Sequence, residues 1–144
     1  MDPLGELERG ACELAVTLGP AGFAFVLLDS GRSSGGTFAS GEFRRKDRRL
    51  EVHFRWSLGL VSYHVGADSL AHEDYVRAVQ SIHGIQGVPE YPGFSDDPQA
   101  GFRGLRIDLE RFGRVFISGT VDEFGRLREW VDGHPKPTGF AALR

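Results

Sequence analysis

Hydrophobic and polar residues alternate along much of the chain, and this pattern predicts mainly β-structure. Residues 12–19 and 22–29 predict a first pair of strands around a Gly-Pro-Ala-Gly turn, and residues 37–43 predict a further short strand. The basic run RRKDRR at 44–49 is interpreted as a solvated turn. Twenty glycines fit this picture, because glycine adopts the backbone angles that tight turns require.

Residues 50–65 predict a hairpin with one apolar and one polar face. Folding about Leu58-Gly59 pairs apolar residues across the strands: Val52 with Val65, Phe54 with Tyr63, and Trp56 with Val61. The same register puts His53 opposite His64 on the polar face. We therefore expect Trp56 to lie in the core.

One segment, residues 70–83, changes to the helical period. Its apolar residues recur at spacings of four, four and three, which suits packing on a sheet: Ala71, Tyr75, Val79 and Ile82. Asp68 or Ser69 can accept the free N–H groups of the first turn, and Gly84 stands where a glycine commonly ends a helix.

The stretch after this helix, residues 85–101, contains three prolines and three glycines and predicts a long loop. Residues 102–121 then predict a second hairpin around the turn Arg111-Phe112-Gly113. The apolar residues that would pair on its buried face are Leu105, Ile107 and Leu109 with Gly119, Ile117 and Val115.

The end of the chain predicts a last strand at 126–131, with Trp130 in the core, and a tail that docks through Phe140 and Leu143. Together these elements predict a single α+β domain over residues 1–144. We expect a twisted antiparallel sheet of six or seven strands with one helix packed on one face.

The predicted elements between residues 48 and 143 come in a characteristic order. A hairpin is followed by the helix LAHEDYVRAVQSI, a loop, and a hairpin reading F-x-x-L-x-I-D-L-x-x-x-G-x-V-x-I-S-G-T. This order resembles the WapI-type immunity proteins of bacterial polymorphic toxin systems and related small bacterial families. The resemblance implies a non-enzymatic protein that binds and neutralises a toxin domain, often a nuclease. The chain departs from the family pattern at its end, where DGHPKPTGFAALR replaces a longer final strand.

The composition is that of an ordinary soluble protein, with 40% hydrophobic and 26% charged residues. We expect no membrane partner, because no apolar run approaches the roughly 18 residues of a membrane span. A net charge of -3 argues against a general nucleic-acid binder, which is usually basic. No secretory signal is visible and the single Cys12, interpreted as an inert strand thiol, cannot form an internal disulfide, so we expect a cytoplasmic location.

The strongest candidate for enzyme chemistry is the predicted pair of His53 and His64, with His72 or His134 as a third zinc ligand. The alternative is an ordinary, half-solvated sheet face. Because two histidines on a hairpin commonly meet by accident, we favour the second interpretation and expect no cofactor.

Other chemical candidates are weaker. The acid pairs Asp96-Asp97 and Asp122-Glu123 lie in predicted loops, where solvated acids are the simpler interpretation. Ser118 lacks the sequence context of a nucleophile elbow.

The long loop offers the best surface for a protein partner. Aromatic side chains and acids that would suit a basic partner, such as a nuclease, follow one another in it: Glu90, Tyr91, Phe94, Asp96 and Asp97. The alternative is that Tyr91 and Phe94 close the core beneath the loop. We therefore predict a protein-binding module that is not an enzyme, an immunity-like inhibitor that occludes a bacterial toxin domain.

Two other classes of function stand as alternatives. One is a small hydrolase or zinc enzyme that uses His53 and His64. The other is a structural subunit that forms a homodimer through an exposed sheet edge.

Overall fold

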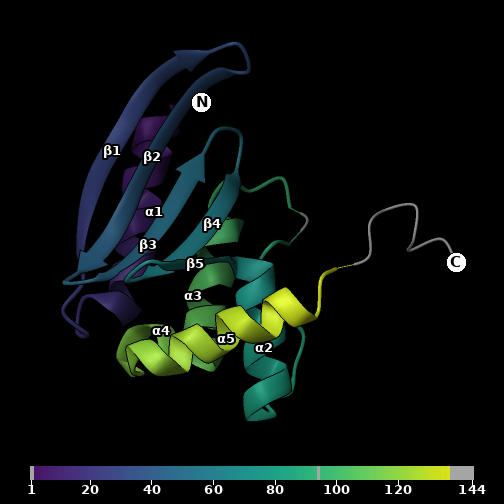
Figure 1. Cartoon of the computed structure of the whole chain (residues 1–144). Helices are drawn as coiled ribbons and strands as arrows, with labels where there is room; N and C mark the ends of the chain where they lie inside the picture. Colours follow the sequence, from purple (N-terminus) through teal and green to yellow (C-terminus); the bar gives the residue numbers. More distant parts are fainter. Residues whose placement is uncertain (1, 94, 137–144) are drawn as a thin grey trace, which may run out of the picture.

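The computed structural model describes residues 2–93 and 95–136 and contains one antiparallel sheet of five strands (Figure 1). The strands are β1 (Ala24–Ser33), β2 (Gly36–Arg45), β3 (Arg48–Phe54), β4 (Leu58–Val65) and β5 (Asp68–Ala71). The helices are α1 (Pro3–Leu18), α2 (His72–His83), α3 (Ala100–Phe112), α4 (Arg114–Ser118) and α5 (Val121–Gly133). Each strand pairs with its neighbours in sequence, so the sheet is a meander.

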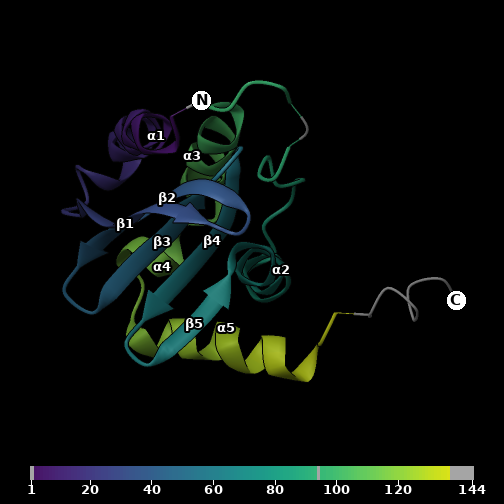
Figure 2. The ribbon, with the colours of Figure 1, turned by 90° about the horizontal axis from the view of Figure 1, so that it is seen from above.

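The predicted α+β class and the antiparallel sheet are confirmed, but the predicted numbers of strands and helices are wrong. The sheet has five strands rather than six or seven, and several helices take the place of one. α1 lies behind β1, β2 and β3, with α3 beside it (Figure 2). We call this side of the sheet the inner face. On the opposite side, the outer face, β2 and β3 have no helix over them in the part of the chain that the structure describes (Figure 1).

The hairpin predicted at residues 50–65 forms β3 and β4, with the expected faces but a different register. The apolar side chains buried on the inner face are those predicted: Val52, Phe54, Val61, Tyr63 and Val65. Val52 faces Val61 rather than Val65, because the chain turns at 55–57. This shift is even between Leu50 and His53, so these side chains stay on their predicted faces, and a register irregularity follows between His53 and Phe54. Trp56 falls in the turn and is 68% exposed, so its predicted place in the core is wrong.

The single helix predicted from the sequence exists as α2 but starts later than residue 70. Asp68 and Ser69, the predicted caps, belong instead to β5, which pairs with β4. The residue before the first turn is Ala71, whose side chain makes no capping hydrogen bond. The two residues predicted as caps are therefore paired in the sheet and do not cap α2.

The apolar stripe of α2 is confirmed in its centre. Tyr75 and Val79 are fully buried, whereas Ile82 near the end of the helix is 41% exposed. Gly84 ends the helix with a φ of 66°, the left-handed conformation that glycine accepts without steric cost.

Three segments predicted as strands are helical: 12–19 lies in α1, 102–121 covers α3 and α4, and 126–131 lies in α5. The buried residues of α3 follow a helical spacing: Phe102, Leu105, Leu109 and Phe112. Ile107, predicted on the buried face of a strand, is 36% exposed. The alternation of Leu105, Ile107 and Leu109 was therefore coincidental, and the wider helical period was the true signal.

A capping signal at the start of α5 and a close contact between α1 and α3 accompany these helices. Thr120 and Glu123 form a capping box at the start of α5, with each side chain accepting the other's backbone N–H at 3.0 Å. In α1, Gly10 lies against the ring of Phe102, and a Cβ at this position would come within 2.4 Å of that ring. Glycine therefore permits the close approach of α1 to α3.

The basic run at 44–49 does more than form a solvated turn. Arg45 and Arg48 point to the inner face and donate hydrogen bonds to backbone carbonyls of α4 and its end. These acceptors are Val115, Phe116, Ile117 and Gly119. These hydrogen bonds therefore connect the sheet to α4. The predicted docking of Phe140 and Leu143 lies outside the described residues.

Candidate functional site

A buried network of polar side chains lies between the sheet and the helices. The hydroxyl of Tyr63 on β4 is 2.8 Å from Nδ1 of His72 on α2, and Nε2 of His72 is 3.0 Å from Oδ2 of Asp108 on α3. His72 is only 4% exposed and Asp108 only 1%. The hairpin predicted at 102–121 did not reveal this network, because alternation with Leu105, Ile107 and Leu109 puts Asp108 on the opposite, polar face of a strand. The helical spacing of Asp108 with Leu105 and Phe112 was the signal that could have found it.

Asp108 also holds the loop between α2 and α3. Its carboxylate accepts hydrogen bonds from the backbone N–H groups of Glu90, at 2.7 Å, and Tyr91, at 2.9 Å. The hydroxyl of Tyr91 donates to the backbone carbonyls of Leu58 and Gly59, and burial raises its pKa to about 12. Every buried side-chain N and O atom in the described ranges has a hydrogen-bond partner. The network therefore acts as a structural connection between loop, helices and sheet.

A second group of titratable side chains lies on the outer face. The carboxylate of Glu51 is 2.5 Å from Nε2 of His53 and 3.1 Å from Nε2 of His64. The hydrogen bond with His53, followed by the charges of both histidines, lowers the pKa of Glu51. The histidines do not face each other as predicted, because His53 faces Leu60 and His64 faces Arg49. Glu51 nevertheless brings them together.

The predicted third zinc ligands do not join this group. His72 is buried on the inner face, and His134 follows α5, where its ring stacks on Trp130. Among residues 2–93 and 95–136 there is no group of three His, Cys, Asp or Glu side chains that could hold a metal ion. The two outer-face histidines therefore lack a third histidine beside them.

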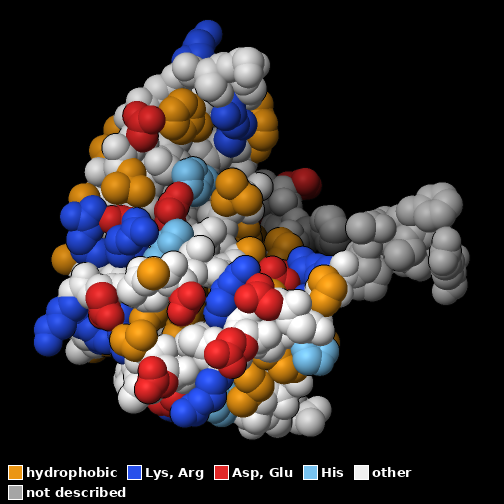
Figure 3. Space-filling model, in the orientation of Figure 1, with side chains coloured by type: hydrophobic (Ala, Val, Ile, Leu, Met, Phe, Trp, Pro, Cys, Tyr) orange, Lys and Arg blue, Asp and Glu red, His pale blue; other side chains and the backbone are white. Residues whose placement is uncertain are grey.

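Next to this group, a buried carboxylate joins two strands of the outer face. Glu42 on β2 is only 1% exposed, although no helix of the described chain covers it. Arg44 and Arg49 lie over it, with Nε of Arg44 at 2.9 Å and Nη1 of Arg49 at 3.0 Å from its carboxylate oxygens. The outer face thus displays basic and acidic side chains side by side, with histidines between them (Figure 3).

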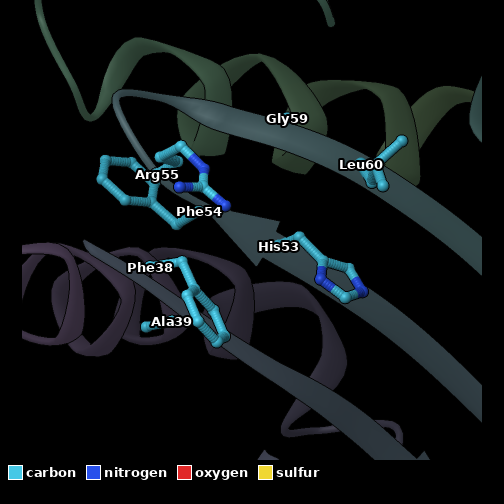
Figure 4. A pocket seen from close by; sticks show the side chains of 7 residues that line it. All are labelled: Phe38, Ala39, His53, Phe54, Arg55, Gly59 and Leu60. Carbon is cyan, nitrogen blue, oxygen red and sulfur yellow. The ribbon is translucent and has the colours of Figure 1, made fainter. Parts of the chain in front are cut away.

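Toward the hairpin tips the outer face becomes apolar. A cavity of about 220 Å³ opens there, lined from three adjacent strands by Phe38, Ala39, His53, Phe54, Arg55, Gly59 and Leu60 (Figure 4). Leu60 is 65% exposed, and the exposed Trp56 lies against Gly36 at the β1–β2 turn. The guanidinium of Arg55 lies 5.7 Å from the ring centre of Phe38 and donates to Gly36 O at 2.9 Å. We call Phe38, Arg55, Trp56 and Leu60 the tip patch.

The predicted binding loop divides into buried and exposed parts. Tyr91 is buried, which agrees with the alternative that it closes the core. Asp96 and Asp97 are exposed, as is Glu90. The hydrogen bond from the backbone N–H of Gln99 lowers the pKa of Asp97 most. The guanidinium of Arg103 on α3, which donates to the Asp97 carboxylate at 2.7 Å, lowers it further. Phe94 lies outside the described residues.

The remaining predicted candidates occupy ordinary positions. Asp122 and Glu123 lie in the first turn of α5 rather than in a loop. Ser118 ends α4, and its hydroxyl donates to a backbone carbonyl of the same helix. Cys12 is exposed on α1, so its predicted place in a strand is wrong. Trp130 is half-buried against the core from α5.

Comparison with protein-family models, with curated proteins and with solved structures finds no match to this chain. The likeness to WapI-type immunity proteins therefore stays a prediction. Within the described ranges, no helix has the length and apolar character needed to cross a membrane.

Proposed function

We propose that this protein is a non-enzymatic protein-binding module, an immunity-like inhibitor that occludes a bacterial toxin domain. The observation that carries the proposal is the exposure of Trp56 and Leu60 at one end of the outer face, 68% and 65% respectively. Large apolar side chains that stay in water lose the stabilisation that burial would give, and their clustering commonly marks a protein interface.

The composition of the tip patch supports a protein partner. Tryptophan and arginine contribute more binding energy than other residues in protein interfaces, especially beside a pocket that excludes water. Arg55 is held by Gly36 O and by the hydroxyl of Ser33, at 2.9 Å each, so little side-chain freedom remains to be lost on binding. The adjoining cavity, between Phe38 and Leu60, has room for one apolar side chain of a partner.

The acidic loop lies next to this patch and supports a basic partner. The hydrogen bonds of Tyr91 to Leu58 and Gly59 bind the loop to the start of β4, directly after the turn that carries Trp56. A cleft of about 310 Å³ between the loop and that turn is lined in part by Ser57 and Asp97. Exposed acids beside aromatic anchors steer a basic protein toward the patch and so favour fast association.

The proposed mechanism is steric and electrostatic occlusion of the toxin. The tip patch supplies the apolar contact, and Asp96 and Asp97 supply the charge that suits a basic surface such as that of a nuclease. No step of this mechanism requires a reactive group in the chain.

The test uses the purified product of the gene next to this protein's own, which the proposal expects to contain a toxin domain. Isothermal titration calorimetry should detect tight binding, and coexpression should protect cells from the toxin. Trp56→Ala together with Leu60→Ala should weaken binding by about a hundredfold, because the tryptophan anchor is expected to contribute about 2 kcal/mol and the leucine about 1 kcal/mol. Absence of both binding and protection would overturn the proposal.

Matched variants separate the two parts of the surface. Asp96→Asn together with Asp97→Asn should mainly slow association and reduce its dependence on salt. Val121→Ala, which also alters an exposed apolar residue but on α5, should leave binding unchanged. Circular dichroism checks that each variant is folded. Unchanged affinity after the Trp56 and Leu60 substitutions would remove the tip patch from the model.

A further inference from the structure

β1 is an open edge strand of unusual length and exposure. Among residues 2–93 and 95–136 its only partner strand is β2, and eight of its ten residues are exposed. Leu27 and Leu28 in its centre are 46% and 44% exposed. The backbone groups on the free side of an edge strand can pair with a further strand, and proteins usually protect such edges by shortness, charge, β-bulges or cover.

An apolar groove runs beside this edge. It lies between α1 and β1 and is lined by Glu8, Ala11, Cys12, Ala15, Phe25 and Leu27. The only charged member is Glu8, which is exposed. A strand added to β1 would therefore gain backbone hydrogen bonds and also cover apolar surface on the inner side.

A β-bulge decides which residues of β1 share a face. Phe25 and Leu27 pair with Phe43 and Gly41 of β2, and after the bulge Ser30 and Arg32 pair with Ala39 and Thr37. These four β2 residues alternate along their strand, so they point to one side, the inner face, where Phe43 and Ala39 are buried. Phe25, Leu27, Ser30 and Arg32 consequently point to the inner face as well.

We propose that two copies of this chain pair through β1, antiparallel about a two-fold axis perpendicular to the sheet. Symmetric pairing requires that facing residues lie on the same face of the sheet. Because of the bulge, this condition is met when Leu27 faces Ser30 of the second copy and Phe25 faces Arg32 of the second copy. The two sheets then join into one, with both sets of helices on the same side.

The charges along the edge support a second copy as the occupant. Arg32 and Glu8 are exposed, and neither has an ion-pair partner within the described ranges. In this register Arg32 of each copy lies over Phe25 of the other, beside the groove that Glu8 lines. The symmetry creates this contact twice, so two ion pairs and two cation–π contacts form at one seam.

The dimer does not depend on the proposed inhibitor function. The seam lies along β1, whereas the exposed anchors of the tip patch lie on β4 and the β3–β4 turn. Loss of dimerisation therefore leaves the toxin-binding surface intact, and the two proposals fail separately.

Sedimentation velocity over a range of concentrations tests the dimer. The native chain should shift from monomer to dimer, with slower hydrogen exchange of the β1 amides in the dimer. Leu27→Asp should abolish the dimer. Arg32→Glu should weaken it by about tenfold or more, because two ion pairs become repulsive contacts.

A charge exchange gives the sharpest result. Glu8→Arg alone should also weaken the dimer, and the double variant Glu8→Arg with Arg32→Glu should restore it toward the native affinity. In the same register Leu28 faces Asp29 of the second copy, which brings the two Asp29 carboxylates near the axis, so Asp29→Asn should strengthen association. Leu60→Asp, an equally polar change on the outer face, should not alter it.

Two results would overturn the proposal. One is a monomer at every concentration. The other is a dimer whose dissociation constant does not respond to Leu27→Asp or to the charge exchange, since the seam would then lie elsewhere. Circular dichroism and thermal unfolding confirm that these surface variants remain folded.

Discussion

Histidine and carboxylate side chains meet on both faces of the sheet, but in opposite surroundings. On the inner face His72 lies 3.0 Å from Asp108, and both are almost wholly buried. On the outer face Glu51 lies between His53 and His64 at 2.5 and 3.1 Å, and all three side chains reach water. Similar distances therefore describe two different physical situations.

The difference shows that burial, rather than proximity, decides how much such a contact stabilises a protein. In the interior, a carboxylate that loses its partners stays desolvated, and the cost is several kcal/mol. At the surface, water replaces the lost partner and screens the charge. The same residue types thus hold the fold together on one face and form a titratable, accessible surface on the other.

Removing the inner carboxylate should have the largest effect. Asp108→Ala leaves the backbone N–H groups of Glu90 and Tyr91 and the ring of His72 without their acceptor. We expect the free energy of unfolding to fall by about 3–5 kcal/mol, measured by urea denaturation. Glu110→Ala, on the exposed side of the same helix, should cost at most about 1 kcal/mol.

Hydrogen exchange in the Asp108→Ala variant should also distinguish local opening of the loop from unfolding of the core. If the loop is held as described, hydrogen exchange at Glu90 and Tyr91 should accelerate in Asp108→Ala before the rest of the protein unfolds. An equal loss of stability in Asp108→Ala and Glu110→Ala would contradict the contrast between the faces.

Glu42 should give an intermediate effect, because it is buried on the outer face while its arginine partners remain partly in water. Glu42→Gln removes the charge that faces Arg44 and Arg49 but keeps an acceptor oxygen. The free energy of unfolding should fall by about 1–2 kcal/mol in urea denaturation. A smaller loss than in Glu13→Gln, whose carboxylate lies in a partly exposed ion pair, would count against this ranking.

Glu51 should give the smallest effect, visible mainly as a change in pH dependence. Its pKa in the folded protein is lowered from 4.5, so its contribution is present above that pH and is lost as the pH falls through the folded value. As the pH falls below 4.5, the free energy of unfolding should therefore decrease less in the Glu51→Gln variant than in the native protein. We expect a difference of at most about 1 kcal/mol, because the side chain is partly exposed. Parallel pH profiles for the two proteins would rule out this contribution.

Part of the fold could be predicted because its pattern has only one plausible period. Val52, Phe54, Val61 and Tyr63 alternate strictly, so the faces of β3 and β4 were predicted correctly even though the register was wrong. An even error in register preserves side-chain direction, and turn position depends on geometry that alternation does not encode. This is why Trp56 was placed in the core.

Residues 102–121 could not be assigned in the same way, because they fit two periods at once. Leu105, Ile107 and Leu109 alternate, while Phe102, Leu105, Leu109 and Phe112 also form a helical stripe. Burial against α1 and the sheet favours the helical stripe over the alternating set. The capping box of Thr120 and Glu123 is a separate sequence signal for the next long helix, α5. Glu90, Tyr91, Phe94, Asp96 and Asp97 remain a prediction as a partner contact, now with Tyr91 buried as the loop's anchor.

The amino-acid sequence by itself determined the local features of this protein: the alternating faces of the central strands, the stripe and glycine end of α2, and the proline-rich loop. Only the tertiary structure decided which period the ambiguous segments adopt and which carboxylates are buried. The physical reason is that local patterns depend on neighbouring residues, whereas desolvation of Asp108 and exposure of Trp56 depend on elements far apart in the chain.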